Sequence, residues 1–197
     1  MMGNERVLET GRLRIRNFHR SDASLCWESW GQDESLGQYI ASYPMTDLGQ
    51  MEELVRGFLS NEDAWVIEDK GSEKIVGYIT MDIPYRQLGV GEIGYVIGEK
   101  YQKHGYAFEA IHCILAEYLI NQGLYMIEAK CNETNHASLK LLEKVGFHVD
   151  GRLRGRRMNL LTGERTDLIV ASVTQAEFRS DTVEKRPKEI ELLKQKK

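Results

Sequence analysis

The sequence predicts a single α/β domain built around a central β-sheet, and three observations support that prediction. Two β-rich runs, 64–68 and 75–83, are separated by the turn-forming stretch 69–74, which predicts an antiparallel hairpin. A further β-rich run at 91–98 leads through a short loop into a long amphipathic helix. The chain has 197 residues, which is enough for one domain with a complete hydrophobic core.

The N-terminal region is predicted to contain one strand and two helices. Residues 8–18 alternate leucine or isoleucine with arginine, which predicts one half-buried strand. The Ser-Asp pair at 21–22 offers an N-cap for a helix that runs to about Trp30. The Thr-Asp pair at 46–47 caps a second helix, because the apolar residues of 51–59 recur at intervals of three and four.

The second half of the chain alternates helices and strands. The long helix carries one apolar stripe, formed by Ala107, Ala110, Ile111, Ile114, Leu115, Tyr118 and Leu119. A strand is predicted at 124–131. The helix after it is capped by Asn135 and ends at Gly146, where Phe147 provides the usual hydrophobic latch.

The C-terminal region is predicted to close the sheet with strands at 149–153 and 167–174, joined by the polar, basic segment 154–165. We therefore place the domain at 1–180. Charged residues dominate the tail at 181–197, which predicts a frayed, solvated helix, with docking at a subunit interface as the alternative.

Composition excludes several classes of function. A net charge of -4 argues against a protein that coats nucleic acid, so no nucleic-acid partner is expected. No apolar run approaches the ~18 residues of a membrane span, so no membrane partner is expected either. The cysteines, Cys26, Cys113 and Cys131, do not have zinc-site spacing, and the histidines show no ligand pattern. We predict no metal site, and reduced thiols in a cytoplasmic protein.

The most informative stretch is the loop that joins the 91–98 run to the long helix. Its sequence is Gln102-Lys103-His104-Gly105-Tyr106-Ala107. A helix N-terminus leaves NH groups unpaired and carries a partial positive charge, so a phosphate or diphosphate is a natural ligand there. The alternative is an ordinary helix-opening turn in which Gly105 merely relaxes the backbone.

This loop resembles the acetyl-CoA diphosphate loop of the GNAT N-acetyltransferases, and further motifs follow in the family order. They are Asn132, the Asn-x-x-Ser of Asn135 and Ser138, and Glu-Lys-Val-Gly-Phe at 143–147, with Leu-Arg-Ile-Arg at 13–16. The set is most similar to the RimJ/RimL-like branch, which acetylates ribosomal-protein N-termini. The resemblance covers roughly 8–178. It implies a mixed, mostly antiparallel sheet with a splayed parallel strand pair, and acetyl-CoA as co-substrate without a metal.

The resemblance also assigns roles around the co-substrate. It implies that the backbone NH groups from Lys103 to Ala107 bind the diphosphate, that the side chains of Gln102 and Lys103 donate to it, and that Lys103 or His104 meets the 3'-phosphate. Tyr95 and Ile97 lie on the strand whose backbone pairs with pantetheine, and an NH near Ile97 polarises the thioester carbonyl. Asn132 holds the pantetheine amide or the acceptor; the alternative is a turn asparagine.

Ser138 is the candidate proton donor to the departing sulfur of CoA. It falls on the apolar stripe of its helix, one turn after Asn135, and a buried hydroxyl needs a partner. The alternative is a hydrogen bond within its own helical turn. Asn135 serves as a helix cap in either case. Many GNAT enzymes use a tyrosine four residues after this serine, and this chain has Leu142 there.

The general base is the least defined feature. Glu92 is the candidate; the alternative is a salt-bridged strand carboxylate. The related ribosomal-protein enzymes place a glutamate in the segment after Gly-Phe, but the matching position here is Arg157. A basic cluster surrounds that position, and it indicates either an acidic group on the acceptor or a solvated hairpin face: Arg152, Arg154, Arg156 and Arg157.

The sequence therefore predicts transfer of acetyl from acetyl-CoA to a primary amine, such as a protein N-terminal amine, by direct attack in a ternary complex. One alternative is an acceptor that is a small amine, such as a polyamine or an aminoglycoside. Another is an acyl-CoA-binding regulator without catalysis, and a third is an interaction module that uses the charged tail. A monomer and a homodimer both remain open.

The Gly89-x-Gly91-x-x-Gly94 pattern leads into a strand instead of a helix, which disfavours a dinucleotide site.

Overall fold

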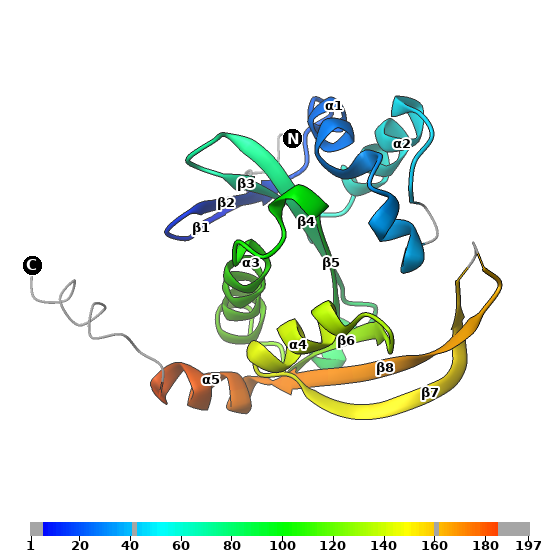
Figure 1. Ribbon diagram of the computed structural model, residues 1–197. Coiled ribbons are helices and arrows are strands. Elements are labelled where there is room, and N and C mark those ends of the chain that lie inside the picture. Colours follow the sequence, from blue (N-terminus) through cyan, green and yellow to red (C-terminus); the bar gives the residue numbers. More distant parts are fainter. Residues whose placement is uncertain (1–5, 41–42, 160–161, 185–197) are drawn as a thin grey trace, which may run out of the picture.

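An eight-stranded sheet forms the centre of the protein, as the computed structural model shows (Figure 1). The structure describes residues 6–40, 43–159 and 162–184. The strand order is β1-β2-β3-β4-β5-β6-β8-β7, and every neighbouring pair is antiparallel except β5 and β6. The predicted α/β class with a mixed, mostly antiparallel sheet is therefore confirmed. The strands are β1 (Val7–Glu9), β2 (Leu13–Asn17), β3 (Ala64–Asp69), β4 (Lys74–Asp82), β5 (Val90–Ile97), β6 (Met126–Asn132), β7 (His148–Met158) and β8 (Arg165–Thr174).

The first predicted strand, 8–18, is wrong in its extent. The chain makes two strands there, β1 and β2, which pair antiparallel across a turn closed by the Thr10 NH and the Leu13 carbonyl at 2.9 Å. The alternation of arginine with leucine or isoleucine covers only 12–16, and the predicted strand was extended across Thr10-Gly11, a turn-forming pair that the prediction did not use. The predicted hairpin of 64–68 and 75–83 is confirmed as β3 and β4.

One face of the sheet is covered by the N-terminal helices. They are α1 (Asp22–Cys26), the π-helical η1 (Trp27–Gly31), the 3₁₀ helix η2 (Glu34–Gln38) and α2 (Leu48–Phe58). Their buried side chains pack with alternate residues of the sheet, including Val66, Tyr78 and Val96. Asp47 caps α2 through a hydrogen bond from the Gln50 NH, as predicted.

The predicted cap of the first helix is wrong in its mechanism. Ser21 occupies the N-cap position, but its side chain makes no capping hydrogen bond. The Asp22 carboxylate instead accepts from the His19 NH at 2.7 Å and pairs with the Arg16 guanidinium at 2.8 and 3.0 Å. Asp22 is buried, so this ion pair ties α1 to β2 from inside the protein.

The opposite face of the sheet packs against the long helix. It comprises α3 (Tyr106–Leu115) and its π-helical continuation η5 (Ala116–Asn121). The predicted apolar stripe is confirmed, since it is buried from Ala110 to Leu119 and packs on residues such as Ile79, Ile93 and Ile127. Figure 1 shows α3 on the side of the sheet away from α1 and α2. Short 3₁₀ turns, η3 (Arg86–Leu88) and η4 (Glu99–Tyr101), flank β5.

The helix between β6 and the closing strands has the predicted ends. It is α4 (His136–Lys144), whose N-cap Asn135 accepts from the Ser138 NH at 3.1 Å. At its C-terminus the Phe147 NH bonds the Leu142 carbonyl and the Gly146 NH bonds the Glu143 carbonyl, both at 3.0 Å. Gly146 has φ +98°, so this is a Schellman motif.

The closing strands are longer than predicted. Most of the basic segment 154–165, expected to connect them, extends β7 and β8. Side chains of β7 are exposed on both faces, so no apolar alternation marked its length in the sequence. Figure 1 shows the far end of this hairpin bending toward the N-terminal helices. The predicted tail at 181–197 begins inside α5 (Gln175–Glu184), and 185–197 lie outside the described residues. None of the described helices is long and apolar enough to cross a membrane.

Candidate active site

A cleft opens where β5 and β6 separate. The two strands pair only from Val90 to Ile93 with Met126 to Ala129, so the splayed pair expected from the family resemblance is present. Beyond that point lies a cavity of about 890 Å³, which falls within the ordinary size range of ligand sites. Most predicted site residues line it: Tyr95, Ile97, Gln102, Lys103, Gly105, Tyr106, Ala107, Asn132, Asn135 and Ser138. Glu92 and His104 are not among the described lining residues.

The loop before α3 presents backbone donors to this cleft. Gly105 is the N-cap with φ +83°, and Lys103 also has a left-handed backbone at φ +63°. None of the hydrogen bonds found among the described residues uses the NH groups from Lys103 to Ala107. Consecutive NH groups turned outward beside a helix N-terminus form an anion-binding concavity.

Arg12, which the sequence did not single out, holds this loop in place through contacts with His104 and Tyr106. Its guanidinium donates to the His104 carbonyl at 2.9 Å and lies 4.9 Å from the ring centre of Tyr106. It also pairs with Glu109 at 2.7 Å, and Thr10 donates to the same carboxylate. Partial burial acts to raise the pKa of Glu109, but the hydrogen bonds from Thr10 and Arg12 outweigh it and lower that pKa.

The exposed edge of β5 faces the gap between the strands. The Gly98 NH bonds the Val76 carbonyl of β4 at 3.1 Å. Because successive NH groups of a strand point to opposite edges, the Ile97 NH points away from β4 and toward the gap. The Ile97 carbonyl accepts from the Gln102 side-chain amide at 3.0 Å, which ties the phosphate loop to the end of the strand.

Ser138 and Tyr95 meet across the cleft. Their hydroxyl oxygens are 2.7 Å apart, although the two residues come from α4 and β5. The partner of Ser138 is thus another element of the site, and not its own helical turn, which was the alternative interpretation. Burial raises the pKa of Tyr95, and the hydrogen bond with Ser138 acts in the opposite direction.

Cys131 lies beside this hydroxyl pair on the floor of the cleft. Burial raises the pKa of its thiol, whereas the hydrogen bond with Ser138 and the positive charge of Arg157 lower it. Arg157 lines the same cavity, although it comes from the distant β7–β8 hairpin. The sequence singled out Arg157 as the position where the related ribosomal-protein enzymes have a glutamate, and also counted it in the basic cluster, without indicating that its side chain lines the cleft.

Glu92 forms an ion pair with Lys130 on the neighbouring strand, and its side chain is 39% exposed. This is the salt-bridged arrangement considered as the alternative to a general base. The charged side chains that line the described part of the cleft are all cationic: Lys103, Lys130, Lys144 and Arg157. His136 lines it too, but it is exposed at the start of α4. No aspartate or glutamate belongs to this described lining.

The structure also bears on the glycine pattern and on the question of a metal site. Gly91 and Gly94 lie within β5 and Gly89 precedes it with φ +67°, so this glycine pattern opens a strand, unlike a dinucleotide fingerprint. Among the described residues, no cluster of His, Cys, Asp and Glu side chains has the arrangement of a metal site.

A splayed parallel strand pair beside an anion-binding helix N-terminus defines the acetyl-CoA-dependent acyltransferase class of fold. Residues 12–148 match the family model described as Acetyltransferase (GNAT) domain, and the chain belongs to this family. It is an acetyl-CoA-dependent N-acetyltransferase.

Individual relatives agree with this assignment. The chain is 27% identical over 177 residues to a protein named Uncharacterized N-acetyltransferase p20 from Bacillus licheniformis, covering 87% of this chain and 98% of the relative. Its fold is similar to that of a GNAT acetyltransferase from Bacillus anthracis, with a TM-score of 0.78, 23% identity and coverage of 87% and 100%. RimL, a ribosomal-protein α-N-acetyltransferase solved with coenzyme A, has a TM-score of 0.77 at 15% identity, covering 86% of this chain and 98% of RimL. These neighbours are consistent with the RimJ/RimL-like branch.

Proposed function

We propose that the protein acetylates a primary α-amine, such as the N-terminus of a peptide or protein, by direct attack in a ternary complex with acetyl-CoA. The observation that carries this proposal is the convergence of three groups on one cleft. They are the unpaired loop NH groups, the Ile97 NH and the Ser138 hydroxyl, and the described lining contains no carboxylate.

The residues present fit the co-substrate. The NH groups from Lys103 to Ala107 bind its diphosphate, and the Lys103 ammonium adds a positive charge there. The Gln102 side chain already donates to Ile97, so it acts by holding the loop in place. The free edge of β5 at Tyr95 and Ile97 pairs with the pantetheine amides as an additional strand would. Asn132 and Asn135 line the opposite wall.

The transfer step needs two contributions from the protein. The Ile97 NH donates to the thioester oxygen, and a donor aimed at developing negative charge contributes about 3 kcal/mol. As the amine nitrogen bonds the carbonyl carbon and the C–S bond breaks, Ser138 donates its proton to the departing sulfur. The Tyr95 hydroxyl lies within hydrogen-bonding distance of Ser138 and returns a proton to it, and Tyr95 takes up a proton from solvent in its place. The proton lost by the amine leaves to solvent.

The charges of the cleft favour an α-amine over other amines. An α-amine has a pKa near 7.7 to 8.0, so about a tenth of it is neutral at pH 7, whereas lysine, near 10.4, is almost entirely protonated. Lysine therefore requires a stronger base, and Glu92, which is paired with Lys130, is not among the described lining residues. Polyamines and aminoglycosides carry several positive charges, which this cationic cleft repels.

Mass spectrometry after incubation with acetyl-CoA tests the proposal. The acceptors are a peptide with a free N-terminus, an N-terminally blocked peptide with one lysine, and spermidine. We expect the α-amine product to dominate. Predominant lysine or spermidine acetylation contradicts the proposed acceptor, and CoA binding without thiol release from any amine identifies a regulator that lacks catalysis.

The pH dependence provides a second test. At subsaturating peptide, the rate should rise with pH and level off near the pKa of the acceptor amine, because only the neutral amine attacks. Peptides whose N-terminal pKa values differ should shift the midpoint by the same difference. A midpoint that stays constant across the peptides indicates a group of the protein as the controlling base.

A further inference from the structure

A small side pocket adjoins the acceptor end of the cleft. Its volume is about 210 Å³, enough for one side chain or a carboxylate with its linker. It is formed where the bent end of the β7–β8 hairpin approaches the segment after η2 (Figure 1). Residues shared by the pocket and the main cleft join the two spaces: Gln38, Tyr39, Ile40, Asn132 and Arg157.

The pocket contains two arginines whose charges are not paired with a carboxylate of the described residues. Neither Arg156 nor Arg157 takes part in any ion pair found among the described residues, and both line the pocket. The contrast with Arg152 on the same strand is clear, because Arg152 is bonded to Asp167 and Glu133. Arg152 is therefore paired within the protein, whereas Arg156 and Arg157 have no ion-pair partner among the described residues.

Asn132 adds a second kind of donor. Its side-chain oxygen accepts from the NH and the hydroxyl of Thr134, both at 3.0 Å, which fixes the orientation of the amide. Its NH₂ group has no acceptor in the part of the chain that the structure describes, and the residue lines both spaces. A guanidinium and an amide NH₂ together match the oxygens of a carboxylate.

The pocket is close to the reaction centre. Arg157 lines both the side pocket and the main cleft, and Ser138 lines that same cleft. No carboxylate of the described residues lines either space, so the protein itself supplies no counter-charge there. Because Arg157 and Ser138 line the same cleft, one acceptor molecule can place an anion beside Arg157 and its amine near Ser138.

We infer that the side pocket binds a carboxylate carried by the acceptor close to its amine, and that Arg157 is the residue that determines this specificity. The inference rests on the proposed function and names its substrate class. Two sources share the chemistry: an acidic side chain near a peptide N-terminus, and the α-carboxylate of a free amino acid.

Matched acceptor pairs test the inference. The peptide amides Ala-Glu-Ala-NH₂ and Ala-Gln-Ala-NH₂ differ only in a side-chain charge. Alanine and alaninamide differ in the α-carboxylate and, because of it, in the pKa of the amine, so kcat/KM for this pair is calculated for the neutral amine. We expect the acidic member of at least one pair to have a kcat/KM about tenfold higher, because a charge-assisted hydrogen bond to an exposed arginine has that order of effect. The pair that shows the preference identifies the source. The preference should weaken as salt is added.

Substitutions at Arg157 test whether the preference for acidic acceptors comes from the side pocket. Arg157→Gln should abolish it by lowering kcat/KM for the acidic acceptor about tenfold, with less than a twofold change for the neutral one. Arg154→Gln is the matched control, since Arg154 lies on the same strand but outside both described linings. Arg157→Glu should turn the preference toward Ala-Lys-Ala-NH₂. Arg157 is exposed, so these changes leave folding intact.

The outcomes separate this inference from the proposed function. Equal kcat/KM values within both pairs, or a preference that persists in Arg157→Gln, overturn the inference while α-amine acetylation stands. Absence of acetylation of every amine overturns the proposed function itself, and the inference with it.

Discussion

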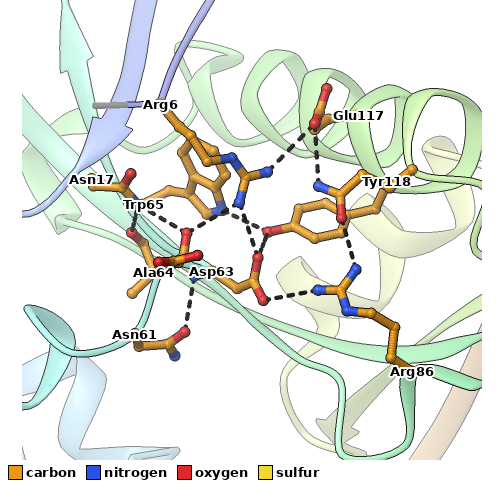
Figure 2. Close-up of polar contacts among 11 residues, drawn as sticks. Arg6, Asn17, Asn61, Asp63, Ala64, Trp65, Arg86, Glu117 and Tyr118 are labelled. Carbon is orange, nitrogen blue, oxygen red and sulfur yellow. Dashed lines mark hydrogen bonds and ion pairs between the residues drawn. The ribbon is translucent and has the colours of Figure 1, made fainter. Parts of the chain in front are cut away.

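Two polar regions of the molecule differ in how completely their side chains are paired. The first surrounds Asp63, where Arg6, Arg86 and the Tyr118 hydroxyl all donate to one carboxylate at 3.2, 3.5 and 2.5 Å (Figure 2). The second is the acceptor end of the cleft, where Arg156 and Arg157 line a pocket without any carboxylate among the described residues.

The polar side chains of the Asp63 cluster bond mainly to one another. Trp65 donates from its ring NH to the Tyr118 oxygen at 3.1 Å, and the Arg6 guanidinium lies 4.6 Å from the centre of the Trp65 ring. The Glu117 carboxylate forms an ion pair with the second terminal nitrogen of the Arg6 guanidinium at 3.4 Å. In Figure 2 the side chains of Arg6, Arg86, Trp65 and Tyr118 all donate to acceptors of the protein, whereas Arg156 and Arg157 have no ion-pair partner among the described residues. We therefore interpret the Asp63 cluster as stabilising the fold and the acceptor end of the cleft as a ligand-binding site.

The largest effect should come from breaking the Asp63 cluster. Asp63→Ala leaves Arg6 and the Tyr118 hydroxyl without an acceptor, and we expect a loss of about 2 kcal/mol in the free energy of unfolding. Urea denaturation measures it. Glu53→Gln is the control, because the Glu53–Arg56 pair is 77% and 66% exposed and such pairs contribute less than about 1 kcal/mol. Acceptor selectivity should not change in Asp63→Ala; a change would show that the two regions are coupled.

Within the cleft, Ser138→Ala should lower kcat about tenfold or more while CoA affinity and unfolding free energy stay nearly constant. The hydroxyl acts on the departing sulfur, so its loss affects the transition state and not ground-state binding. Single-turnover kinetics and calorimetry measure the two quantities, with Ser24→Ala as an exposed helical control. Unchanged turnover removes Ser138 from the mechanism.

Arg12→Gln should weaken CoA binding about fivefold. The change removes the contacts that hold the phosphate loop in place, and a hydrogen bond contributes about 1 kcal/mol. Calorimetric titration with CoA measures the affinity. Arg14→Gln, which alters an arginine paired with Glu68 on the neighbouring strands, serves as the control. Equal affinities of the two variants would show that the loop holds its conformation without Arg12.

The smallest effect should come from Tyr95→Phe, which removes the partner of Ser138 but keeps the ring. We expect kcat to fall about threefold without a change in KM, because only the replacement of the serine proton is impaired. In a Ser138→Ala background the same substitution should have no further effect. Additive effects in the double variant would mean that Tyr95 acts independently of Ser138.

Local patterns predicted the elements whose signals lie within a few residues. The β3–β4 hairpin, the apolar stripe from Ala110 to Leu119, and the Asn135 cap with its Gly146 stop were all confirmed. Predictions were wrong where the local signal was ambiguous. The strand predicted at 8–18 was extended from the alternation of 12–16 across the Thr10-Gly11 turn, and β7 shows no apolar alternation because both of its faces are exposed.

By itself the sequence indicated the family and placed a loop with free backbone NH groups before α3, because such groups at a helix N-terminus depend only on neighbouring residues. Tertiary structure alone decided which side chains complete the site. Tyr95 and Ser138 are 43 positions apart, and Arg12 and Glu109 are 97 apart. Arg157 reaches the cleft only because its hairpin bends toward the N-terminal helices. Such contacts depend on how the sheet is paired and curved, and that is a property of the whole chain.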